Sequence, residues 1–203
     1  MSIRREKRTP TGNREKSRTP PHGTNARNPL FGRVPTGWSV KKFSDVFRFL
    51  GSEPIPRDLL TKAGEGSQTY CIHYGDIHAK YTKEILDFEV ESQQVPVLRS
   101  NDVLSQKPDY LMNGDLVIAD ASEDYQGIAE AVELRNLKGR RVVGGLHTIT
   151  ARDTGGDTLP GYRTYALRHP AVRKRIMRAA NGLSVFGISK SNLSKIDILL
   201  PPR

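Results

Sequence analysis

Short β-prone segments separated by glycine-containing turns occupy the centre of the chain, and they constrain its fold more than any other feature. Asn113-Gly114-Asp115 leads into residues 116–119, a continuous apolar run typical of a strand buried on both faces. Residues 70–74 and 77–81 flank a second turn signal, Gly75-Asp76, and predict a strand pair or a bulged strand. Three more strand-like segments follow, at residues 128–134, 142–143 and 146–151.

Before this centre, order is expected to begin at residues 34–38, where Pro35 and Gly37 mark a turn. Apolar residues then recur at helical spacing between Val40 and Leu50, which predicts a short helix or a helix–strand unit. Residues 51–67 contain two prolines and three glycines, which block any long regular element, so this segment is predicted to be loop-like.

After the centre, the hydrophobic period becomes helical. Residues 162–180 predict an amphipathic helix that Pro170 restarts and Asn181-Gly182 ends. Its basic side, with Arg173, Lys174 and Arg178, is interpreted as solvated, with phosphate contact as the alternative. Residues 189–195 predict a short helical turn, and residues 196–200 a closing strand that stops at Pro201-Pro202.

These patterns predict one folded unit in 203 residues, of the α/β (α+β) class, with a curved mixed, mainly antiparallel sheet and short flanking helices. Residues 1–33 are expected to be a disordered basic tail, because they hold few apolar side chains to offset their ordering entropy. The tail is interpreted as a basic arm that contacts DNA phosphates or as a solvated extension. The folded domain is expected to span residues 34–203.

Charge and composition narrow the class of partner. The formal net charge of +10 favours polyanions such as nucleic acid or an anionic membrane. No apolar run approaches the roughly 20 residues of a membrane span, and no secretory signal follows the basic N-terminus, so a cytoplasmic location is expected. Cys71 is the single cysteine, which excludes an internal disulfide and a cysteine-based zinc site.

The motifs that support catalysis are missing from the sequence. The five histidines lack metal-binding spacing, and there is no phosphate-binding, dinucleotide-binding or serine-nucleophile motif. A nuclease motif starting at Pro108-Asp109 would need a lysine where Arg135 stands. Asp120, Glu123 and Asp124 are interpreted as a solvated loop in preference to a metal site. We therefore predict no catalytic residue, no cofactor, no metal and a non-catalytic protein.

Several segments, in their order, resemble the target-recognition half of the specificity subunits of type I restriction-modification systems. Gly37-Trp38-Ser39-Val40-Lys41-Lys42-Phe43-Ser44-Asp45-Val46 resembles the opening of that family. Ile72-His73-Tyr74-Gly75-Asp76-Ile77 and residues 111–119 resemble its two Gly-Asp segments. Residues 187–193 resemble its Ile-Ser-x-x-x-Leu turn, and residues 196–202 its closing strand with proline. The resemblance covers residues 34–203.

This resemblance implies a half-subunit that binds double-stranded DNA and guides a methyltransferase (modification) subunit, and in some systems also a restriction subunit. In the family a long helix follows the closing strand and pairs with a second half-subunit. That helix has no counterpart before Arg203, so a homodimer or a second half-subunit stays an open expectation. The alternatives are a DNA-recognition subunit of another restriction class and a basic RNA-binding protein.

DNA contacts are expected from polar and basic side chains in the loops. The residues predicted to bind DNA are Lys80, Tyr81 and Lys83 after the first Gly-Asp pair, Ser122, Tyr125 and Gln126 after the buried strand, Arg140 and Arg141 before the strand at 142–143, and Lys190 and Asn192 in the turn at 189–192. For this last turn, helix capping is the favoured alternative.

Overall fold

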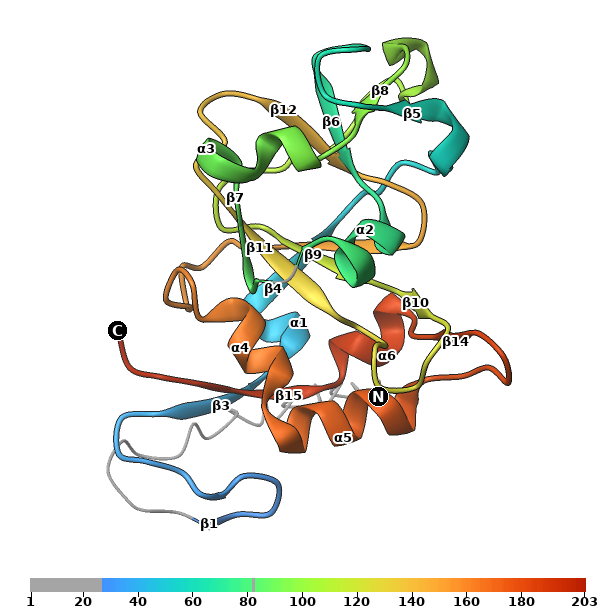
Figure 1. Ribbon diagram of the computed structural model, residues 1–203. Helices are drawn as coiled ribbons and strands as arrows, with labels where there is room; N and C mark the ends of the chain where they lie inside the picture. The colour runs from blue at the N-terminus through green and yellow to red at the C-terminus, as the bar shows by residue number, and fades with distance from the viewer. Residues whose placement is uncertain (1–26, 82) are drawn as a thin grey trace, which may run out of the picture.

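The computed structural model describes residues 27–81 and 83–203 (Figure 1). Its centre is a five-stranded sheet in the order β4-β13-β9-β11-β7. The strands span Phe47–Leu50 (β4), Thr148–Asp153 (β13), Leu116–Ala119 (β9), Ala131–Arg135 (β11) and Ile85–Asp87 (β7). All neighbours are antiparallel except β11 and β7. The predicted central strand β9 is fully buried, as its apolar run requires.

A second sheet of four strands lies at one end of the molecule, in the order β12-β6-β8-β5 (Figure 1). Its strands span Arg141–Gly144 (β12), Thr69–Ile72 (β6), Val97–Leu98 (β8) and Leu60–Thr61 (β5). β12 and β6 are parallel and the other pairs are antiparallel. We call this the distal sheet. The prediction of mixed, mainly antiparallel pairing is confirmed, although the strands are divided among several sheets.

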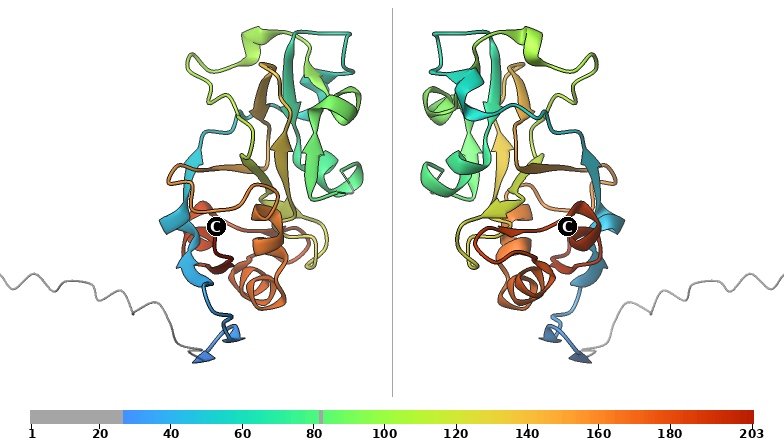
Figure 2. Two further views of the ribbon diagram at one scale, coloured as in Figure 1. Left: turned by 90° about the vertical axis from the view of Figure 1, so that its left-hand side faces the viewer. Right: turned by 90° about the vertical axis from the view of Figure 1, so that its right-hand side faces the viewer.

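The opposite end of the molecule is helical (Figure 2). It contains α1 (Phe43–Val46), α4 (Arg163–Arg168), α5 (Pro170–Ala179) and α6 (Lys190–Ser194), together with β3 (Ser39–Lys42) paired to β15 (Asp197–Leu200). Val172 and Ile176 pack with Phe43, Leu193 and Ile198 against one side of the central sheet. The predicted helices at 162–180 and 189–195 and the closing strand are confirmed.

Local chemistry explains where these helices begin. Pro170 stands in the first turn of α5, where its missing N–H costs nothing, and the His169 side chain accepts a hydrogen bond from the Ala171 N–H at 3.2 Å. The Ser189 hydroxyl caps α6 by accepting from the Asn192 N–H at 3.1 Å. Among the described residues, no helix is long and apolar enough to cross a membrane.

The remaining elements are short. They are β1 (Arg27–Asn28), β2 (Gly32–Arg33), α2 (Tyr74–Ala79), α3 (Phe88–Glu91), β10 (Ala121–Ser122), β14 (Phe186–Gly187) and the 3-10 turns η1 (Arg57–Leu59), η2 (Ser92–Gln94) and η3 (Asn101–Val103). The end of the expected tail, residues 27–33, forms the β1–β2 hairpin. Residues 1–26 lie outside the described part of the chain.

One predicted element is wrong. Residues 77–81 do not form a strand after a Gly75-Asp76 turn, because Gly75 and Asp76 lie in the first turn of α2. The His73 side chain caps this helix by accepting from the Gly75 N–H at 3.2 Å. Asp76 is fully buried and pairs with Arg57 and Lys80. These contacts stabilise a helix that the local β-propensity opposes, and the one to Arg57 comes from a distant part of the chain.

The second Gly-Asp pair is a turn, as predicted. Gly114 has φ +84°, and Asp115 is buried beside Arg152 of β13. Arg152 donates from Nε and Nη2 to the two Asp115 carboxylate oxygens at 2.8 and 2.6 Å. The hydrogen bonds that Arg152 donates to Asp115 raise the pKa of Arg152, although burial lowers it. This pair joins the turn before β9 to the neighbouring strand.

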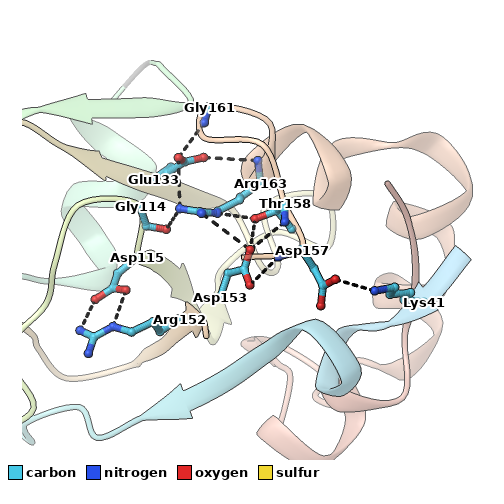
Figure 3. Close-up of polar contacts among 10 residues, drawn as sticks. All are labelled: Lys41, Gly114, Asp115, Glu133, Arg152, Asp153, Asp157, Thr158, Gly161 and Arg163. Carbon is cyan, nitrogen blue, oxygen red and sulfur yellow. Dashed lines mark hydrogen bonds and ion pairs between the residues drawn. The ribbon is translucent and has the colours of Figure 1, made fainter. Parts of the chain in front are cut away.

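Arg163, at the start of α4, links the helical end to the central sheet (Figure 3). It lies 3.6 Å from Glu133 of β11 and 3.8 Å from Asp153 of β13, and it donates to the Gly114 carbonyl at 2.5 Å. Burial alone would raise the pKa of Asp153, but hydrogen bonds from Thr158 and Asp157 hold it below its usual value. We call this group of contacts the Arg163 network.

Breaking the central ion pair should destabilise the fold. We predict that Arg152→Met lowers the free energy of unfolding by about 3 kcal/mol, because the buried Asp115 carboxylate loses its partner. Urea unfolding followed by circular dichroism measures this. Lys41→Met is the control, since its ion pair with Asp157 is half-exposed and should contribute less than about 1 kcal/mol. Equal losses in both variants would contradict the prediction.

Gly114 should also be intolerant of a side chain. A Cβ at this position would lie 1.9 Å from Arg163 Nη1, and its φ is already unfavourable for other residues. We expect Gly114→Ala to lower the midpoint of thermal unfolding well below that of Gly139→Ala. Gly139 has a similar φ of +77° but open space around its Cβ, so that variant reports the backbone cost alone, about 1 kcal/mol. Matching midpoints would show that the Arg163 network adapts to the methyl group.

Candidate nucleic-acid interface

A cavity of about 510 Å³ lies at the distal sheet, next to the turn between β11 and β12. Lys138, Arg140 and Arg141 line it together with Gln68 and Tyr70. No carboxylate is among its lining residues. We call it the basic cavity. Its charge would attract the phosphates of a nucleic acid.

The backbone of the β11–β12 turn places these cations. Asn136, Lys138 and Gly139 all have positive φ, which makes the turn tight and brings Lys138 close to the start of β12. Lys138 Nζ lies 2.7 Å from Glu89, but both side chains are more than half exposed, so this pair is weak. Arg140 donates to the Leu137 carbonyl at 3.3 Å, and Arg141 is exposed. All three cations are therefore accessible to a ligand.

A second cavity, a groove of about 550 Å³, also lies at the distal sheet. Arg57, Lys62 and Lys80 line it together with Gln93 and Gln94. We call it the glutamine groove. The loop at residues 62–66 separates the two cavities: Lys62, Ala63 and Glu65 line the groove, whereas Gly64 and Gly66 line the basic cavity. The two cavities therefore share this loop.

Asp76 holds two of the groove's cations. Arg57 donates to both of its carboxylate oxygens, and Lys80 Nζ lies 2.8 Å away. Burial alone would raise the pKa of Asp76, but the hydrogen bonds from Arg57 and Lys80 hold it below the usual value. The hydrogen bonds that Arg57 donates to Asp76 raise the pKa of Arg57. One buried negative charge thus fixes two cations at the groove.

Three of the residues predicted to bind DNA lie at these cavities: Arg140 and Arg141 at the basic cavity, and Lys80 at the glutamine groove. Lys83 is exposed in the connection between α2 and β7. Tyr81 belongs to the core, where burial raises the pKa of its hydroxyl and leaves that oxygen without a hydrogen-bond partner among the described residues. In this conformation Tyr81 does not face a ligand.

The other five predicted residues lie toward the helical end, where most of them make internal contacts. Ser122 is buried and accepts from the Asp124 N–H, and the Tyr125 hydroxyl donates to the Met177 carbonyl. The Gln126 carbonyl accepts from Arg173, Lys190 Nζ donates to the Leu50 carbonyl at 2.9 Å, and Asn192 Nδ2 donates to the Ala179 carbonyl at 2.9 Å. The structure does not bring these residues to the distal surface.

Sequence reasoning missed Lys138, Gln68, Arg57, Lys62 and the two glutamines at 93 and 94. Lys138 could have been found, because Lys138-Gly139 is a turn signal directly before Arg140 and Arg141. The others come from segments that carry no local signal for binding. They meet only because β5, β6 and β8 pair in the distal sheet.

His147 lies 3.2 Å from Asp120, and the His73, His78 and His147 rings pack around Tyr74. Within residues 27–81 and 83–203, no group of three or more His, Cys, Asp or Glu side chains is placed to hold a metal ion. Cys71 is fully buried, and its burial raises the pKa of the thiol to about 12.

Neither a family model nor a curated protein sequence matches the chain. Solved structures do match. The S subunit of a type I restriction-modification system from M. genitalium matches 87% of this chain and 37% of its own, at 14% identity and a TM-score of 0.47. The HsdS subunit from Thermoanaerobacter tengcongensis matches 86% of this chain and 36% of its own, at 14% identity and a TM-score of 0.51.

A third match comes from a structure described as the basis of complex assembly and conformational transition of the type I R-M system. It covers 86% of this chain and 37% of that chain, at 15% identity and a TM-score of 0.52. This chain therefore spans little more than a third of the length of each of these proteins. At such low identity the likeness concerns the fold, and the conclusion is that the chain has the fold of a single domain of a type I restriction-modification S (HsdS) subunit.

Proposed function

We propose that this chain is a sequence-specific DNA-binding module of a type I restriction-modification system. The observation that carries the proposal is the basic cavity, whose lining has three cations and no carboxylate, on a fold shared with S subunits. In this proposal the distal end faces double-stranded DNA. The module then directs a methyltransferase subunit, and a restriction subunit where one exists, to the bound sequence.

Lys138, Arg140 and Arg141 would contact phosphates, because their charge acts at long range and needs no particular base. Gln68 lies in the same cavity and has an amide that can hydrogen-bond to a base edge. Affinity would then come mainly from the cations and specificity from the neutral polar side chains.

The chemical steps would belong to the partner subunits, so the chain itself would be non-catalytic and would need no cofactor. Its role would be to hold the DNA in one register while a partner modifies or cleaves it. Because restriction and modification act on DNA inside the cell, we place the protein in the cytoplasm.

Removing the cations should weaken DNA binding without changing its sequence preference. We predict that Arg140→Ala/Arg141→Ala reduces the affinity of the full chain for duplex DNA. The slope of log affinity against log salt should become shallower by about two, since each phosphate contact contributes about 0.9. Fluorescence anisotropy of a labelled duplex over a salt series measures both quantities.

The control is Lys174→Ala/Arg178→Ala, which removes the same charge from exposed positions on α5 at the other end of the molecule. We expect this variant to retain most of the affinity and the slope. If it loses as much as the Arg140/Arg141 variant, net charge alone explains binding, and the basic cavity is not the DNA site.

A further inference from the structure

We infer that the glutamine groove reads base edges in the major groove of DNA, with adenine as the base that Gln93 and Gln94 recognise. This inference rests on the proposed function, since it assumes that the distal surface faces DNA. It adds the residues that determine specificity and the base that they select.

The position of the groove supports this role. It shares the loop at residues 62–66 with the basic cavity. In this inference a duplex held by the cations of that cavity extends past the loop to the groove. Lys62 is exposed on this shared loop, where it could contact the phosphates between the two cavities. Most phosphate contacts would then come from the basic cavity, and the glutamine groove would add base contacts to the one proposed for Gln68.

The backbone that carries the two glutamines is firmly held. Gln93 and Gln94 lie in η2, where the Val95 N–H donates to the Ser92 carbonyl at 3.2 Å. Ser92 and Val95, on either side of the pair, are buried. Both glutamine side chains are nevertheless exposed, and neither amide has a hydrogen-bond partner among the described residues. A fixed backbone that presents unpaired, accessible amides is suited to forming specific hydrogen bonds with a ligand.

The chemistry of these side chains favours a base over a phosphate. A glutamine amide offers one donor and one acceptor in a plane, which matches N6 and N7 of adenine in the major groove. The amide is neutral, so it adds little attraction to a phosphate. Guanine presents two acceptors at the same edge and would leave the amide oxygen facing an acceptor.

The charges around the groove agree with an anionic ligand. Arg57 and Lys80 carry two positive charges against the single negative charge of the buried Asp76 carboxylate. Lys62 adds a further positive charge. Glu65 is the one acidic residue in the lining, and its carboxylate accepts from the Thr61 hydroxyl at 3.2 Å. The groove therefore stays positive overall and draws the backbone of the duplex towards the amides.

The test is selection of bound duplexes from a random-sequence pool at fixed salt, with the full chain and three variants. Gln93→Ala/Gln94→Ala removes the proposed readers. Gln106→Ala removes an exposed glutamine that lines neither cavity, and Arg140→Ala/Arg141→Ala removes phosphate contacts. Anisotropy with the selected duplex, and with the same duplex carrying guanine in place of adenine, gives the preference for adenine as a ratio of affinities.

We expect the wild-type chain and Gln106→Ala to select one motif that contains adenine. Gln93→Ala/Gln94→Ala should lose roughly 5- to 150-fold in adenine preference, the range for a bidentate base contact, while its affinity for an unrelated duplex stays unchanged. A double variant that keeps the full adenine preference overturns the inference and leaves the proposed function standing. A wild-type chain that selects no motif overturns both.

Discussion

The contacts of Arg163 join the helical end of this protein to its central sheet. Its guanidinium lies beside carboxylates of β11 and β13 and binds the carbonyl of the turn before β9, so one side chain reaches three adjacent strands of the central sheet (Figure 3). Glu133 also accepts from the Gly161 N–H at 2.7 Å, which ties the loop before α4 to the same point. A charge this deeply buried is tolerated because its carboxylate partners are buried with it.

A buried carboxylate paired with cations also occurs at the distal end, where it has a different consequence. Asp76 is as deeply buried as the acids of the Arg163 network, but its partners Arg57 and Lys80 are half-exposed and line the glutamine groove. In the centre, buried charge pairs stabilise the packing of elements. At the distal end, a buried carboxylate instead positions cations on the surface, where a polyanionic ligand can reach them.

Much of the fold could be predicted from local patterns. The apolar run at 116–119 indicated a strand buried on both faces, and the apolar spacing at 162–180 indicated an amphipathic helix restarted at Pro170, because both signals depend on neighbours in the chain. The segment at 77–81 was misread, since its local propensity is overridden by the pairing of Asp76 with Arg57. The order of weak motifs led to the S-subunit fold that the solved structures share.

The sequence by itself determined the class of the fold, the basic character of the protein and the lack of recognisable catalytic motifs, because these follow from composition and short-range periodicity. Only the tertiary structure decided which polar residues share a surface. Arg140 and Arg141 reach the basic cavity, whereas Ser122, Tyr125 and Lys190 make internal contacts toward the other end. Strand pairing between segments far apart in the chain produces this division, and no local pattern encodes which strands will pair.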